Sequence, residues 1–123
     1  MRNDVLNLVR TAVPEILGYD HARLSQDIDE ASQFLTPDFA SEYQALGEGE
    51  IRRTSKRYQA VVVAQVVSAG LEALDAETAQ ALVFVDQTTR TSMLPVPRVD
   101  TSRVRVHLIR TDGEWRVSAI EPF

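Results

Sequence analysis

The sequence predicts an α+β fold, with N-terminal helices packed in the concave face of a curved antiparallel sheet of about four strands. Apolar residues recur at helical spacing through the first half of the chain. From Tyr58 onward, apolar and polar residues alternate as they do in strands. Residues 99–123 contain two alternating runs joined by Thr111-Asp112-Gly113, which is typical of an antiparallel hairpin. Helices followed by such a sheet make an α+β domain.

Size and composition limit the classes of protein. A chain of 123 residues with 44% hydrophobic and 25% charged residues is typical of one globular domain, residues 1–123. The net charge of −5 argues against a nucleic-acid partner. The absence of cysteine removes disulfides, thiolate nucleophiles and cysteine-ligated metals. No stretch approaches the ~18 apolar residues of a membrane span, and the first residues lack a signal-peptide pattern.

The helical part covers residues 3–47. Val5, Val9, Ala12 and Ile16 share one helical face. Pro14 removes a backbone donor and predicts a kink or break over residues 10–13. Gly18 is expected to end this helix.

Two further helices follow in this part. Asp20 is a suitable cap for a second helix, whose inner face carries Leu24, Ile28, Ala31 and Leu35. Thr36-Pro37-Asp38 is a start signal for a third helix, which is predicted to turn Phe39, Tyr43 and Leu46 inward.

Residues 48–57 are predicted to form a connector. Gly47 and Gly49 loosen the chain there, and Arg52, Arg53, Lys56 and Arg57 follow. Two interpretations remain open. The four cations form a basic patch for anionic headgroups or a partner, or they are a solvated helix end. Charges without interleaved aromatic residues favour the second.

The sheet part covers residues 58–123. Residues 59–67 are rich in valine and predict a strand buried on nearly both faces, with a bend or bulge at residues 68–70 and a turn over residues 71–78. Residues 81–89 predict the next strand. The two prolines in residues 92–97 predict a loop or an edge. In the hairpin, Trp115, Val117 and Ala119 alternate on the returning strand.

The sequence offers no catalytic residue, metal site or cofactor site by motif. His21 and His107 lie in different halves, without a carboxylate at ligand spacing. His107 alternates with Val106 and Leu108, so it is predicted on the outer sheet face. There is no glycine-rich phosphate loop, and no serine lies in a nucleophile elbow.

Four residues are candidates for a pocket or its rim: Tyr19, Tyr43, Asp86 and Trp115. Asp86 shares strand parity with Leu82 and Phe84, so it either faces an apolar pocket as a general base or bonds a backbone amide near the sheet rim. The aromatic residues are interpreted as core packing, and as pocket walls only if a cavity exists.

A family resemblance covers most of the chain. The stretches that carry it are residues 17–46, 56–70, 81–89 and 99–123. Within them stand the Tyr19-Asp20 pair, Phe39 with Glu42-Tyr43, the Phe-Val-x-Gln-Thr strand and the Asp-Gly-x-Trp turn. In this series the chain resembles the soluble domain of the Mce-associated membrane proteins of actinobacteria, which accompany Mce lipid-import machines.

The resemblance implies a cystatin-like, or nuclear-transport-factor-two-like, cone. It also implies a non-enzymatic accessory role beside lipid-import transporter subunits, on the extracytoplasmic side of the cytoplasmic membrane in the cell envelope. Members usually carry an anchor helix ahead of this domain, which this chain lacks, so membrane contact is expected only through such an anchor. The isolated domain is not expected to bind anionic vesicles. The family implies an Asn where this chain has Asp86.

Two other classes remain open. One is a small enzyme that resembles SnoaL-like cyclases or ketosteroid isomerases and uses Asp86 with Tyr43. The other is a plain dimerisation domain that forms a homodimer through the open sheet face. Because one architecture hosts all three classes, the position of Asp86 relative to the cone discriminates between them.

Overall fold

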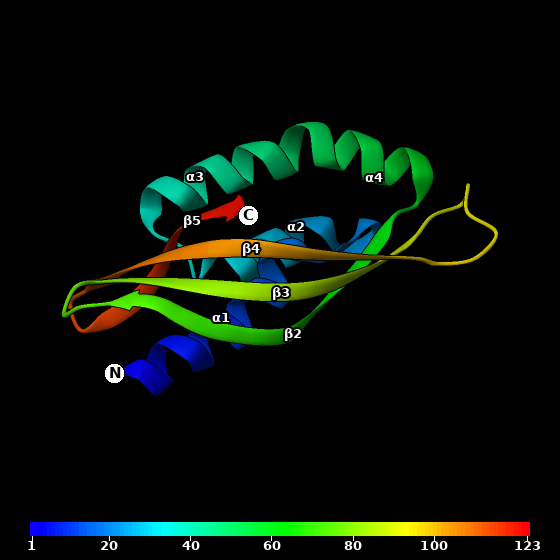
Figure 1. Ribbon diagram of the computed structural model, residues 1–123. Helices are drawn as coiled ribbons and strands as arrows, with labels where there is room; N and C mark the ends of the chain where they lie inside the picture. The colour runs from blue at the N-terminus through cyan, green and yellow to red at the C-terminus, as the bar shows by residue number, and fades with distance from the viewer.

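The computed structural model describes residues 1–123 and confirms the α+β fold (Figure 1). The helical elements are α1 (Arg2–Leu17), η1 (His21–Arg23), α2 (Leu24–Ser32), α3 (Pro37–Leu46), η2 (Gly47–Ile51) and α4 (Arg52–Tyr58). The strands are β1 (Tyr19–Asp20), β2 (Val61–Leu74), β3 (Thr78–Arg90), β4 (Arg98–Thr111) and β5 (Glu114–Pro122). No helix is both long and apolar enough to cross a membrane.

The five strands form one antiparallel sheet in chain order, with the two-residue β1 beside four long strands. β4 and β5 are joined by the predicted tight turn, in which Asp112 and Gly113 have φ of 53° and 80°. Both residues of a type I′ hairpin turn need positive φ, which glycine adopts without strain and aspartate tolerates. The sequence prediction of this hairpin is confirmed.

The core lies between α1 and the concave face of the sheet. Val5, Val9, Ala12 and Val13 of α1 are fully buried, and Ala81, Val83 and Val85 of β3 are fully buried opposite. Small side chains on both layers let the helix approach the sheet closely, as close packing of an interior requires. Val106, Leu108, Trp115 and Val117 of β4 and β5 belong to the same cluster.

α1 continues through Pro14 to Leu17, so the predicted break over residues 10–13 is wrong. Proline deprives the Arg10 carbonyl of its helical donor. Arg10 lies on the exposed side of the helix, where water replaces that donor at little cost. The predicted end at Gly18 is confirmed, and its N–H bonds to the Pro14 carbonyl at 3.0 Å.

Residues 48–57 form helix and not a connector, so that prediction is corrected. α3, η2 and α4 run without interruption across the top of the molecule (Figure 1). The glycines here are not breaks. A Cβ at Gly47 would lie 2.4 Å from Ile28 Cδ1, so this glycine permits close contact between η2 and α2.

β2 is buried on one face only, because the helices cover only the inner face of the sheet. Ala64 is buried, whereas Val63 and Val67 are 51% and 61% exposed. The predicted burial of both faces is therefore wrong. A register shift between Val66 and Ser68 supplies a bulge close to the predicted position. The strand continues to Leu74, which shortens the predicted turn.

The alternation in β5 also changes register. A shift opposite His107 and Leu108 pairs Ala119 with His107 on the outer face and Ile120 with Val106 on the inner face. Ile120 therefore packs on the core in place of the predicted Ala119. Alternation alone does not reveal an inserted residue.

Candidate functional site

One apolar pocket, here called the helix pocket, has a volume of about 300 Å³. It lies between the end of α1, the long helix α3–η2 and strand β5. Ten of its eleven lining residues are hydrophobic. They are Ile16, Leu17, Tyr19, Leu24, Ile28, Phe39, Tyr43, Leu46, Ile51 and Ile120, with Gly47. Its size is at the lower end for small-molecule sites.

Two of the four candidate residues, Tyr19 and Tyr43, line the helix pocket. The Tyr43 hydroxyl donates a hydrogen bond to the Ile16 carbonyl at 2.9 Å. The Phe39 ring meets the Tyr43 ring edge-on at 6.5 Å between centroids. Phe39 and Tyr43 are partly buried and pack against the core cluster, whereas Leu46 is 50% exposed, so its predicted inward position is wrong. Together the three residues line one wall of the pocket.

The Tyr43 phenol is held neutral. Burial, and after it the negative charges of Asp27 and Glu15, raise the pKa of Tyr43 to about 12. A phenol that donates to a backbone carbonyl and titrates this high is a poor proton acceptor near neutral pH. Its role in this structure is to satisfy a carbonyl at the end of α1.

Gln87 makes a second contact of the same kind, which no local sequence pattern predicts. Its side-chain amide donates to the Leu17 carbonyl at 3.1 Å. The last carbonyls of a helix have no partner inside the helix, so Tyr43 and Gln87 together cap α1. Both belong to the motifs that carry the family resemblance. In this structure those motif residues therefore hold α1 against the sheet.

We predict that Tyr43→Phe lowers the free energy of unfolding by about 1–3 kcal/mol at neutral pH, because the Ile16 carbonyl loses its donor. The substitution should also change how the free energy of unfolding falls at alkaline pH. With a folded-state pKa of about 12 against an ordinary 10, the unfolded chain loses its phenolic proton first. Wild-type stability is therefore full below pH 10 and falls between about pH 10 and 12. Urea unfolding from pH 7 to 12 should show a shallower fall for the variant, and equal slopes would contradict this.

Asp86 lies on the opposite side of the sheet from the helix pocket. Ala81, Val83 and Val85 of β3 face the core, so Leu82, Phe84 and Asp86 face outward. The Asp86 carboxylate accepts a hydrogen bond from the Thr101 hydroxyl of β4 at 2.8 Å. The prediction that Asp86 enters a pocket is wrong, and so is a backbone bond at the rim. Because this strand carries apolar residues on both of its faces, the sequence alone does not show which face is buried.

Trp115 is 7% exposed and packs in the main core cluster, away from the helix pocket. Its edge reaches a shallow polar hollow near the hairpin turn that includes Asp4, Arg110 and Arg116. Trp115 is therefore mainly a core residue that also contributes to the lining of this hollow, and it does not line the helix pocket.

His107 lies on the outer sheet face, as its parity predicts. Its Nε2 is 2.9 Å from Glu121 Oε1, and Arg105 reaches Glu121 at 3.6 Å and Glu72 at 2.8 Å. The hydrogen bond from Arg105 lowers the pKa of Glu72, and the one from His107 lowers the pKa of Glu121. These side chains are between 28% and 51% exposed. They form a solvent-accessible charged patch across the open face and contribute little to stability.

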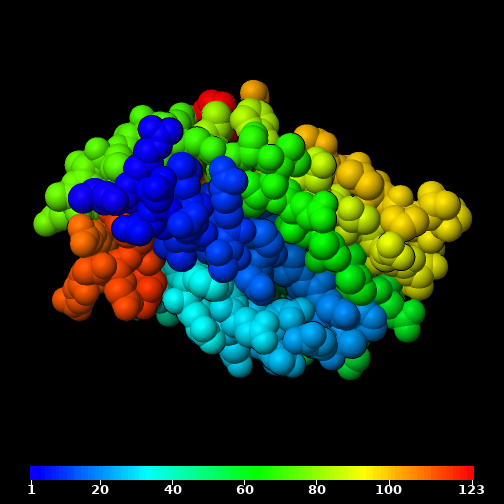
Figure 2. Space-filling model, turned by 90° about the horizontal axis from the view of Figure 1, so that it is seen from below, coloured from blue at the N-terminus to red at the C-terminus, as the bar shows by residue number.

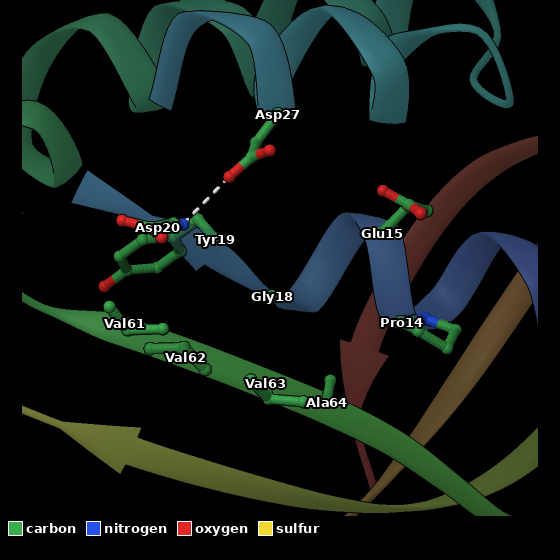
Figure 3. Close-up of a pocket in the computed structure, with 10 residues that line it drawn as sticks. All are labelled: Pro14, Glu15, Gly18, Tyr19, Asp20, Asp27, Val61, Val62, Val63 and Ala64. Carbon is green, nitrogen blue, oxygen red and sulfur yellow. Dashed lines mark hydrogen bonds between the residues drawn. The ribbon is translucent and has the colours of Figure 1, made fainter. Parts of the chain in front are cut away.

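A second hollow, the edge pocket, lies where α1 meets β2 (Figure 3). Figure 3 shows Asp27 reaching down from α2 to the backbone of Asp20, whose N–H it accepts at 2.9 Å. The Asp20 side chain accepts from the Ala22 N–H at 2.9 Å and caps η1, the short turn that leads into α2, and not α2 itself as predicted. Glu15 is exposed. Two of the three carboxylates thus serve the backbone, and no cluster in the structure has the ligands of a metal site.

The basic residues fall into two groups. Arg52 pairs with Glu48 at 3.0 Å and donates to Ser25 Oγ at 2.6 Å. Arg53, Lys56 and Arg57 are exposed and make no ion pair. The helix therefore turns three of the four predicted cations to solvent.

The chain is similar to two proteins of Mycobacterium tuberculosis. Rv1362c is 33% identical over 107 residues, which are 87% of this chain and 49% of that protein. Rv1973, named an outer membrane protein, is 30% identical over 107 residues, which are 87% of this chain and 66% of that protein. The chain thus spans about half to two-thirds of the length of these relatives. No protein-family model matches it.

Solved structures match the whole fold. An IcmL-like type IV secretion system protein from Legionella pneumophila has a TM-score of 0.81 at 14% identity and covers 100% of this chain and 92% of that one. The periplasmic domain of DotI has a TM-score of 0.78 at 14% identity, with 100% and 96% covered. At these identities the likeness concerns the fold, and it agrees with the predicted cone.

Proposed function

We propose that this chain is a non-enzymatic assembly module of a transport machine in the cell envelope, and that the machine is a lipid importer of the Mce type. The observation that carries the proposal is the placement of Asp86. The acid on which the enzyme alternative depends is on the outer face of the sheet, and the cone encloses an apolar pocket instead.

Three further observations support the assembly role. Structural neighbours include named components of type IV secretion systems, and one of them is a periplasmic domain. One relative is named an outer membrane protein. The ordered motifs over residues 17–123 resemble Mce-associated proteins, and this resemblance favours lipid import over secretion. The proposed location is the extracytoplasmic side of the cytoplasmic membrane, and the proposed partners are subunits of the importer.

The chemistry of the helix pocket also favours the assembly role over an enzyme. A cyclase or isomerase needs an acid or base in reach of its substrate. In this structure the Tyr43 hydroxyl is engaged with the Ile16 carbonyl, and the nearby Asp27 carboxylate accepts a backbone N–H. Both polar groups hold structure together. The homodimer alternative is less favoured, because the charged patch of Arg105, His107 and Glu121 crosses the open face.

The proposal is tested by deleting the gene in its own host and measuring uptake of labelled lipid, together with co-purification of importer subunits with the tagged full-length protein. Uptake should fall, and the subunits should co-purify. Unchanged uptake without any importer subunit would refute the proposal.

Asp86→Asn separates the assembly role from the enzyme alternative in the same assay. Asparagine keeps an oxygen that accepts from Thr101, so we predict full complementation and an unfolding free energy within about 0.5 kcal/mol of wild type. Loss of a general base would instead lower a catalysed rate by roughly 100-fold or more. A folded variant that fails to complement would favour the enzyme.

A further inference from the structure

The loop between β3 and β4 forms an exposed apolar tip at one end of the molecule. Residues 91–97 project beyond the sheet in Figure 1, and the same yellow segment stands out at the right of Figure 2. Met93 and Val96 are 72% and 68% exposed, with Pro95 and Pro97 exposed beside them. Large apolar side chains that gather on a projecting loop are typical of a surface that contacts another protein or a membrane.

Hydrogen bonds hold the base of this loop against α4. The Ser92 N–H and hydroxyl both donate to the Tyr58 carbonyl, at 2.8 and 3.1 Å. Within the loop, the Met93 N–H donates to the Thr91 hydroxyl at 3.1 Å. The tip is therefore presented in a defined position next to the end of α4.

Unpaired cations lie on the elements that support the tip. Arg53, Lys56 and Arg57 are spaced to share the exposed face of α4. Arg90 ends β3 just before the loop and pairs in register with Val61, which follows α4 closely. None of these four makes an ion pair, whereas Arg52 and Arg98 are paired with Glu48 and Asp100.

The surrounding sequence adds no opposing charge. Residues 51–71 and 87–99 contain no Asp or Glu, although the chain as a whole has a net charge of −5. The nearest acids along the helix are Glu48 and Glu50 of η2, which precedes α4 at the end away from the loop, and Glu48 is paired with Arg52.

Contrary to the expectation from the sequence, we propose that this end of the protein docks on an anionic lipid surface. Met93 and Val96 enter the headgroup region, and Arg53, Lys56, Arg57 and Arg90 contact lipid phosphates around them. Apolar insertion combined with basic residues is the pattern of reversible interfacial binding. Anionic lipid is favoured over a protein because the apolar groups form a small projecting tip and not a groove or flat face. The segments that carry the tip and the four cations, residues 51–71 and 87–99, also contain no acid. This inference does not depend on the proposed lipid importer.

The test is co-sedimentation of the full chain with vesicles of phosphatidylcholine containing 30% phosphatidylglycerol, compared with pure phosphatidylcholine, from about 50 to 300 mM salt. Binding should require the anionic lipid and weaken as salt rises. Each cation near such a surface changes partitioning by about fivefold. Lys56→Ser with Arg57→Ser should thus lower binding about 25-fold, and Met93→Ser with Val96→Ser at least tenfold.

Matched controls remove similar groups elsewhere. Val67→Ser removes an equally exposed valine from the edge of β2, and Arg10→Ser with Arg110→Ser removes two exposed cations that make no ion pair. Both controls should bind like wild type. Circular dichroism confirms that each variant is folded. The proposal is overturned if anionic vesicles do not sediment the protein, if neutral vesicles do so equally, or if the controls lose as much binding. It also fails if the tip variants lose only a protein partner and bind vesicles normally.

Discussion

Trp115→Ala is expected to lower the free energy of unfolding by about 3–5 kcal/mol, as large-to-small changes of buried aromatic residues do. Trp115 is 7% exposed and belongs to the main core cluster with Val106, Leu108 and Val117. For a domain of this size, each kcal/mol corresponds to roughly 4 °C in Tm. The variant should therefore melt about 12–20 °C lower when unfolding is followed by circular dichroism.

Phe84→Ala is the matched control for this change. Phe84 is also aromatic and lies in a central strand, but it is on the outer face and 38% exposed. Its truncation should cost about 1 kcal/mol or less. If Trp115 contributed only to the surface, its removal would cost as little as that of Phe84. Equal effects of the two changes would therefore contradict the placement of Trp115 in the core.

Local signals predicted those elements whose determinants are close together in the sequence. The turn at residues 111–113, the Thr36 cap of α3 and the inner face of α1 depend on a few adjacent residues, and all are confirmed. Helices that precede an antiparallel sheet also follow from periodicity alone. The fold class was therefore accessible from the sequence.

The errors share a different cause, because each depends on a distant contact. Gly47 looks like a helix break in the sequence, because its close contact with Ile28 of α2 is visible only in the structure. Asp86 is assigned to the wrong face because β3 carries apolar residues on both parities, and only packing against α1 chooses between them. Ala119 and Ile120 exchange faces through a shift in pairing with β4.

The helix pocket was predicted only in part, for the same reason. Tyr19 and Tyr43 were identified because aromatic residues on inward helix faces suit a pocket wall. Ile51 and Ile120 come from a segment read as a connector and from a strand with shifted register. The cap that Gln87 provides to α1 spans 70 residues of sequence, so no local pattern could have revealed it.

Gly18→Ala is expected to destabilise the protein by about 1–3 kcal/mol through a backbone clash. A Cβ at this position would lie 2.8 Å from the Pro14 carbonyl oxygen and 2.9 Å from that of Val62. Gly18 has φ of −110° and ψ of 155°, which alanine adopts without strain. The clash alone therefore decides whether the substitution stabilises or destabilises the protein. Neither carbonyl can move aside as a flexible side chain does, because one ends α1 and the other belongs to β2.

Gly70→Ala supplies the comparison within β2, because a Cβ there would meet nothing within 4 Å. Reduced freedom of the unfolded chain should leave that variant neutral or stabilised by up to about 1 kcal/mol. Urea midpoints of the two variants should therefore move in opposite directions or differ clearly. Similar midpoints would mean that α1 and β2 separate easily at Gly18. The close junction that positions Tyr19 beside the helix pocket would then not be a fixed part of the fold.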